Sequence, residues 1–107
     1  MAFHVVVTDG AQRDIDDIYR FIEANTGPIA AEKVLGELER RVASLVTLPE
    51  RGNVPKELQV LGRTDYRELH YKPYRIFYRL RQSQVFVVAV LDGRRDMNLL
   101  LRQRLIR

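Results

Sequence analysis

The chain has 107 residues, of which 46% are hydrophobic and 30% are charged. This length allows one hydrophobic core, so we expect a single domain over residues 1–107 and exclude a two-domain enzyme. Cysteine is absent, which excludes disulfides and thiolate metal ligands, and no apolar run approaches the ~20 residues of a membrane span. We therefore expect a soluble protein of a reducing, cytoplasmic compartment, with no membrane partner.

Charge is distributed unevenly along the chain, whose formal net charge is +4. Residues 1–62 carry 7 Lys and Arg against 10 Asp and Glu, whereas residues 63–107 carry 11 against 4. All the cations of the second half except Lys72 are arginines, whose planar guanidinium suits phosphate and carboxylate. The second half therefore predicts an anionic partner, although a solvated basic surface without a ligand would have the same composition.

The first half predicts a strand followed by two helices. Residues 3–8 alternate and are rich in β-branched side chains, which indicates a strand. Residues 9–25 then repeat apolar side chains at helical spacing, with Asp9 as the expected N-cap. A second helix begins with Pro28 at its first position and runs to about Leu48, so we expect a helical hairpin.

The second half predicts a loop over residues 50–61 and then an antiparallel meander. Its three strands are expected at residues 66–72, 74–81 and 85–91. The last of these is apolar on both faces, and a short basic helix within residues 96–107 is expected to cover its second face. The predicted fold is α+β, with the order β-α-α-β-β-β-α and the helical hairpin packed on a small, mostly antiparallel sheet.

One strand face has two interpretations. Alternation within residues 74–81 places Phe77 between Arg75 and Arg79 on the face opposite Tyr78. Such a surface suits nucleic acid, because a base stacks on the ring and the arginines bind phosphate. An exposed strand face that arginine keeps soluble has the same pattern.

The turn after the last strand also has two interpretations. Gly93 allows a tight turn that directs Arg94 and Arg95 past the end of the sheet, where they are free to bind an anion. Alternatively, the flanking carboxylates of Asp92 and Asp96 pair with these arginines within the turn.

Metal and cofactor chemistry has little support in the sequence. His4 and His70 are the only histidines, and they fall on separate predicted strands with no ligand cluster nearby. The six glycines are scattered, so there is no phosphate-binding glycine loop, and Ser44 and Ser83 have no evident base beside them. We expect no metal site and no cofactor.

Four segments in register, residues 48–52, 66–69, 74–79 and 90–96, together resemble the RelE/ParE toxins of bacterial type II toxin–antitoxin modules. The resemblance covers nearly the whole chain. It implies a small α+β toxin that a cognate antitoxin neutralises by wrapping a C-terminal segment around it. Members similar to RelE cut messenger RNA on the ribosome, whereas members similar to ParE poison DNA gyrase.

The resemblance also bears on the branch of this family. Arg75 and Arg95 match arginines of the RelE-like nucleases, but Leu101 aligns with their C-terminal tyrosine. Residues 93–107 contain no Tyr, His, Lys or Glu for proton transfer, and arginine stays protonated. We therefore favour a ParE-like gyrase inhibitor that is not an enzyme.

Two alternatives stay open. The first is a ribosome-dependent mRNA endonuclease that draws its site from Arg75, Arg95, Tyr78 and His70. The second is a relative that binds only its antitoxin. For the favoured branch, we expect arginines to contact the target, namely Arg75, Arg79, Arg94, Arg95, Arg102 and Arg104. We expect apolar hairpin residues to contact an acidic tail of a ParD-like antitoxin, namely Ile15, Ile18, Tyr19, Ile22, Leu35 and Leu38.

Overall fold

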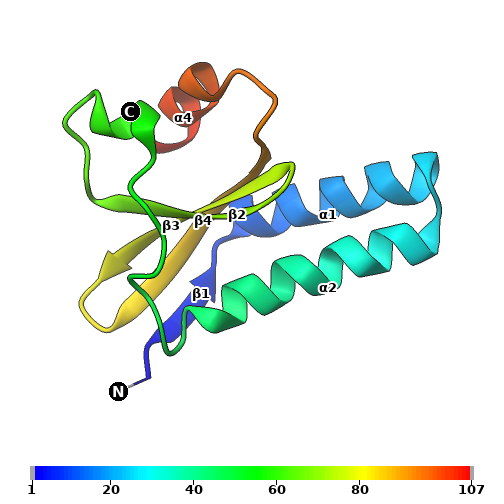
Figure 1. Ribbon diagram of the computed structural model, residues 1–107, viewed down its shortest axis with the longest axis horizontal. Coiled ribbons are helices and arrows are strands. Elements are labelled where there is room, and N and C mark those ends of the chain that lie inside the picture. The colour runs from blue at the N-terminus through cyan, green and yellow to red at the C-terminus, as the bar shows by residue number, and fades with distance from the viewer. Residues whose placement is uncertain (1, 107) are drawn as a thin grey trace.

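A computed structural model describes residues 2–106 and contains a four-stranded sheet with helices on both faces (Figure 1). The elements in chain order are β1 (His4–Val7), α1 (Asp9–Asn25), α2 (Pro28–Ser44), α3 (Lys56–Gln59), β2 (Tyr66–Tyr71), β3 (Tyr74–Arg81), β4 (Gln84–Asp92) and α4 (Met97–Leu105). The predicted α+β class and element order are confirmed, and the predicted loop contains one short helix, α3. Among these residues, no helix is both long and apolar enough to cross a membrane.

The strand order in the sheet is β1-β4-β3-β2. Strand β1 pairs with β4 in parallel, whereas the β2-β3-β4 meander is antiparallel, as predicted. In the β3–β4 pair Phe77 lies opposite Ala89 and Tyr78 lies opposite Val87, so Val88 is an extra residue that forms a β-bulge. The backbone groups of this bulge need hydrogen-bond partners outside the strand ladder.

Each face of the sheet has its own apolar core. The α1–α2 hairpin packs on one face through a cluster that includes Ile15, Leu38 and Tyr78. Helices α3 and α4 pack on the other face, around Phe77 and Leu101. Figure 1 shows the hairpin and the α3–α4 layer on opposite sides of the sheet. The C-terminal helix therefore covers the second face of β4, as the apolar pattern of that strand predicted.

The strands begin and end within one residue of the predicted bounds, whereas two helix ends call for a physical explanation. Thr8, rather than Asp9, is the N-cap of α1, because its backbone is held by Val87 and its hydroxyl accepts a hydrogen bond from the Ala11 N–H at 3.2 Å. Helix α2 ends at Ser44 rather than near residue 48, since the chain turns there and the carbonyl of Val46 accepts a hydrogen bond from the Phe3 N–H at 2.8 Å.

The predicted alternation of β3 is present, but its second face is not an open cationic surface. Tyr78 faces the hairpin and Phe77 faces α3 and α4, and both are fully buried. The hypothesis of an aromatic platform for nucleic acid at Phe77 is therefore wrong, because the α3–α4 layer covers the ring. The predicted last helix is α4, and Arg107, within its predicted range, lies outside the described residues.

Candidate functional site

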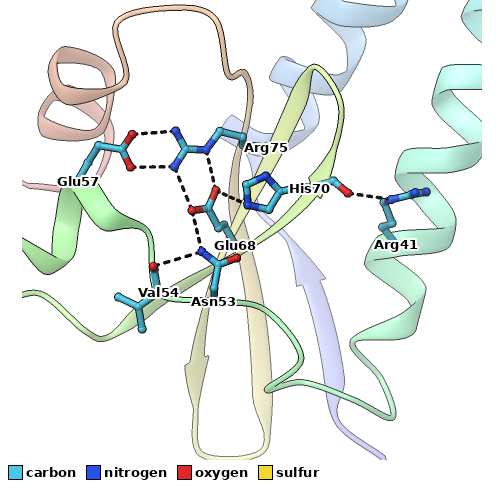
Figure 2. A network of polar contacts seen from close by, with 7 residues as sticks. All are labelled: Arg41, Asn53, Val54, Glu57, Glu68, His70 and Arg75. Atoms are coloured by element: carbon cyan, nitrogen blue, oxygen red, sulfur yellow. Dashed lines mark hydrogen bonds and ion pairs between the residues drawn. The ribbon is translucent and has the colours of Figure 1, made fainter.

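Arg75 is the centre of a polar network on the α3 side of the sheet (Figure 2). Its Nη1 and Nη2 donate to the two carboxylate oxygens of Glu57 at 2.9 and 2.8 Å. Its Nε and Nη2 donate to the two oxygens of Glu68 at 2.6 and 3.0 Å. The Arg75 side chain is only 12% exposed, so the guanidinium is held by two carboxylates in a largely dry environment.

Strand pairing brings the members of this network together. Glu68 lies on β2, is 2% exposed, and also accepts a hydrogen bond from Asn53 Nδ2 at 3.1 Å. A two-residue backbone bridge between Asn53 and Glu68 fixes the intervening loop against β2. His70 lies opposite Arg75 in the β2–β3 register, and its Nε2 is 3.3 Å from Glu68 Oε1. Glu57 reaches Arg75 from α3.

The charges of the network stabilise one another. The hydrogen bonds from Arg75 lower the pKa of Glu57, against the opposing effect of burial. The hydrogen bonds to Glu57 raise the pKa of Arg75, again against burial. At neutral pH both groups are therefore ionised, and the single positive charge of Arg75 faces two carboxylates.

A polar hollow of about 300 Å³ opens beside this network. Its lining residues are Asn53, Val54, Lys56, Glu68, His70 and Arg75. His70 is about half exposed, so it connects buried Glu68 with solvent. The hollow thus places an imidazole beside an arginine whose hydrogen bonds go to carboxylates. Among residues 2–106, no cluster of three or more His, Asp or Glu side chains has the geometry to hold a metal ion.

The structure does not bring all four residues of the nuclease alternative into this hollow. Tyr78 is fully buried on the hairpin side, where its hydroxyl accepts a hydrogen bond from the Gly52 N–H at 3.0 Å. Burial raises the pKa of Tyr78, so its phenol is a poor proton donor at neutral pH. Arg95 is exposed after the end of β4 and does not line the hollow. Only His70 and Arg75 lie together there.

Arg104, one of the predicted target contacts, is part of the fold. Its Nη1 and Nη2 donate to the two oxygens of Asp14 at 2.9 Å each, and Nη2 also donates to the Val88 carbonyl at 3.1 Å. Asp14 in turn accepts a hydrogen bond from the Val90 N–H at 3.0 Å. The Asp14–Arg104 pair therefore supplies hydrogen-bond partners to the backbone of the β4 bulge, which lies beyond the end of β1. The same pair connects α1 with α4.

The exposed arginines differ in whether they already form an ion pair with a carboxylate. Arg94 is 76% exposed but donates two hydrogen bonds to Asp92, at 3.0 and 2.6 Å, which lower the pKa of that carboxyl. Asp96 does not pair with either arginine of the turn; it caps α4 by accepting from the Leu99 N–H at 3.2 Å. The predicted pairing within the turn thus holds for Asp92 and Arg94 only.

Three other arginines complete the predicted target set. Arg95 and Arg102 are exposed and have no carboxylate within 4.0 Å among residues 2–106. Arg79 is 38% exposed, with its Nε 3.9 Å from Asp65 and its guanidinium 5.7 Å from the ring centre of Tyr66. Arg95 and Arg102 are therefore the members of the set that are available to an external anion.

The six hairpin residues predicted to contact an antitoxin lie at different depths. Ile15 and Leu38 are buried in the core, and Ile18 packs against it. Ile22 is half-buried near the end of α1. Tyr19 and Leu35, together with Ile15, line a hollow between α1 and α2. Tyr19 donates a hydrogen bond across that hollow to Glu32 at 2.8 Å.

The acidic partners of Arg75 and Arg104 were not predicted from the sequence. Glu68 had a usable signal, because it lies two residues before His70 and so shares its strand face. Glu57 had none, since it lies in a segment without periodicity that was predicted as a loop. Asp14 had none either, since its partner Arg104 lies 90 residues away.

Comparisons with known proteins agree on one family. The family model described as the ParE toxin of the type II toxin–antitoxin system parDE matches residues 5–97. Toxin ParE3 of Caulobacter vibrioides is 30% identical over 93 residues, which cover 87% of this chain and 89% of the relative.

Solved structures share the fold. The chromosomal ParDE system of P. aeruginosa contains a chain that is 18% identical, with a TM-score of 0.71 over 83% of this chain and 94% of that chain. A chain of the RelBE2 toxin–antitoxin complex of Mycobacterium tuberculosis is also 18% identical, with a TM-score of 0.60 over 84% of this chain and 96% of that chain.

Proposed function

This chain belongs to the ParE toxin family of type II toxin–antitoxin systems, and from this premise we propose that it inhibits DNA gyrase and is neutralised by a cognate ParD-like antitoxin. Inhibition of gyrase requires the toxin to bind a macromolecule, not to break a bond. In this proposal the toxin acts without a catalytic residue and without a cofactor.

The observation that carries the proposal is the state of Arg75. In a nuclease, an arginine at this position would hold a phosphate. Here four hydrogen bonds join its guanidinium to Glu57 and Glu68. A phosphate that displaced these carboxylates would leave Glu68, which is 2% exposed, buried without its cation, at a cost of about 3 to 5 kcal/mol. This arrangement supports a toxin that does not use Arg75 on RNA.

We propose Arg95 and Arg102 as the main contacts to the target, with Arg94 and Arg79 as further contacts. Arg95 and Arg102 are exposed and free of carboxylates within residues 2–106, so binding an anionic surface costs them no existing ion pair. Arg75 and Arg104, the other two arginines of the predicted set, form ion pairs within the fold instead.

The test compares charge reversals at two ends of the sheet. The R95E/R102E double variant should lose gyrase inhibition at least tenfold in a plasmid supercoiling assay, while its circular dichroism spectrum stays that of the wild type. R81E is the matched control, because Arg81 is an exposed arginine at the opposite end of β3. Inhibition by R95E/R102E at the wild-type level would remove these residues from the target surface.

The mRNA endonuclease is a second candidate because His70 and Lys56 line the same hollow as Arg75. Histidine is the side chain that most often acts as a general acid or base, and Glu68 lies 3.3 Å from the His70 Nε2 and orients the ring. The purified protein and its H70A variant are therefore incubated with ribosome-bound mRNA. Cleavage that disappears in H70A would overturn the gyrase proposal. Inactivity on both gyrase and mRNA would instead indicate a relative that binds only its antitoxin.

A further inference from the structure

The outer surface of the α3–α4 layer exposes three aliphatic side chains. Val60 and Leu61, at the end of α3, are 85% and 47% exposed, and Leu99 in α4 is 52% exposed. We call these three side chains the outer aliphatic residues. Helices α3 and α4 contact each other and share one apolar cluster with the sheet, and Figure 1 shows them on the same side of it. The outer aliphatic residues therefore lie on one layer of the molecule.

The sequence of α4 explains why Leu99 faces solvent. Residues 99–101 are consecutive leucines, and successive residues of a helix are about 100° apart, so the three cannot share one face. Met97 and Leu101 are buried on the side that packs against the sheet. Leu99 is exposed on the opposite side, where Arg102 is its neighbour one turn further along. The solvent side of α4 thus combines an aliphatic side chain with a cation.

The charges available on this outer surface are positive. Lys56 begins α3, Arg95 lies just before the N-cap of α4, and Arg102 lies within α4. All three are exposed, and none has a carboxylate within 4.0 Å in the part of the chain that the structure describes. Of the acids on these helices, Glu57 is bonded to the buried guanidinium of the polar network, and Asp96 caps α4. The surface therefore favours a negatively charged partner.

The combination of aliphatic side chains with a few cations fits a protein better than a nucleic acid. Proteins that bind single strands stack the bases on aromatic rings, and none of the outer aliphatic residues offers a ring. Three cations also neutralise few phosphates, so a site of this size would hold duplex DNA weakly. Protein interfaces, in contrast, have an apolar centre and are enriched in arginine. The chemistry therefore favours an acidic protein surface that itself exposes apolar side chains.

We propose that the outer surface of the α3–α4 layer binds an acidic protein surface of the target, with the outer aliphatic residues at the centre of the contact and Lys56, Arg95 and Arg102 paired with carboxylates around them. This inference rests on the proposed function, which supplies gyrase as the target, and adds that the toxin holds the gyrase protein rather than its DNA. A second copy of this chain is a poor occupant, because a two-fold contact would bring the cations of both copies together.

The test measures binding of this chain to purified DNA gyrase without DNA, together with inhibition in the plasmid supercoiling assay. The V60S/L99S double variant changes two side chains that are at least half exposed, so its circular dichroism spectrum should stay that of the wild type. It should bind gyrase weaker by roughly tenfold or more, and inhibit it correspondingly less, because the apolar centre of the contact is lost. R95E/R102E should weaken the same binding, and added salt should weaken the binding of the wild type.

I29S is the matched control for the aliphatic substitutions. Ile29 is 87% exposed and lies near the start of α2, in the hairpin layer on the other face of the sheet. Its replacement should change gyrase binding and inhibition by less than about twofold. A labelled DNA duplex and phosphatidylglycerol vesicles serve as alternative ligands, and the wild type should bind both more weakly than it binds gyrase.

The outcomes separate this inference from the proposed function. If the wild type inhibits gyrase and V60S/L99S inhibits it equally well, the outer surface proposal is overturned while the proposed function stands. Inhibition without binding to DNA-free gyrase, or tighter binding to the duplex or the vesicles, would also overturn it, since the partner would then be a nucleic acid or a membrane. If the wild type neither binds nor inhibits gyrase, the proposed function fails and the inference fails with it.

Discussion

The two faces of the sheet are held by different kinds of interaction. On the hairpin face, α1 and α2 pack through an apolar cluster, and Asp16, Glu32 and Glu39 have no cationic side chain within 4.0 Å among residues 2–106. On the α3–α4 face, a smaller apolar cluster is joined by buried or half-buried ion pairs, those of Arg75 and Arg104. The charges that remain available to partners are therefore mainly acidic along the hairpin, despite Arg13 and Lys33, and basic around α4.

This difference shows that a cluster of arginines in a sequence does not define a binding surface. Of the six arginines predicted to contact the target, Arg75 and Arg104 are only 12% and 27% exposed, and each donates at least two hydrogen bonds to carboxylates. Such an arginine and its carboxylates neutralise each other away from water. Removal of either member therefore leaves the other charge uncompensated and destabilises the fold. The remaining exposed arginines are the ones that a partner can reach at low cost.

Removal of Arg75 should have the largest effect on stability. R75A leaves Glu68 buried without its cation, so we expect the free energy of unfolding to fall by about 3 to 5 kcal/mol. R94A is the matched control, because Arg94 is 76% exposed and its loss should leave the free energy of unfolding nearly unchanged. Urea unfolding followed by circular dichroism measures both. Equal stability of the two variants would contradict a structural role for the Arg75 network.

Gly52 should have the next largest effect. A Cβ at this position would lie 2.5 Å from the Glu68 carbonyl oxygen and 2.7 Å from the Tyr78 hydroxyl. G52A should therefore destabilise the protein by about 2 to 3 kcal/mol through overpacking. G36A in α2 is the control on the hairpin, where a Cβ has ordinary contacts at 3.7 Å and the higher helix propensity of alanine should add about 0.5 to 1 kcal/mol. In thermal unfolding, we therefore expect the midpoint to fall in G52A and to rise in G36A.

Sequence reasoning predicted the parts of the fold that depend on periodic apolar patterns. The apolar face of the α1–α2 hairpin and the alternation of β3 each follow from apolar side chains repeated at a fixed spacing, and both are present. The boundaries at Thr8 and Ser44 were missed, because a hydrogen bond to a distant strand or to the N-terminal segment decides where each helix begins or ends.

The candidate site was less predictable, because it also depends on contacts between residues that are far apart in the sequence. Arg75 and Arg104 were recognised as important cations, but their role depends on Glu57, Glu68 and Asp14, which tertiary contacts bring to them. No local pattern indicates whether a given arginine meets a carboxylate of its own chain or stays in solvent.

The Asp14–Arg104 pair should have a moderate effect. D14A removes the acceptor for the Val90 N–H and the partner of Arg104, so we expect a loss of about 1 to 2 kcal/mol. R104A should give a similar loss, and the double variant D14A/R104A should lose less than the sum of the two. A double-mutant cycle by urea unfolding measures the coupling. Strict additivity would show that the pair does not connect α1 with α4.

The smallest expected effect is the pH dependence that Glu57 contributes to stability. Arg75 holds the pKa of Glu57 below its ordinary value of 4.5, so between the two values the unfolded chain binds more protons than the folded one. This contribution is fully present above about pH 4.5 and is lost as the pH falls through the lower, folded pKa. E57Q should therefore be less stable than the wild type at pH 6, by on the order of 1 kcal/mol, and the difference should shrink as the pH approaches 3. E23Q is the control, because Glu23 is exposed and has no ion pair among residues 2–106. A difference between E57Q and the wild type that stays constant over this pH range would mean that Glu57 titrates in the folded protein as it does in the unfolded chain, and that the bidentate contact of α3 with Arg75 is not maintained in solution.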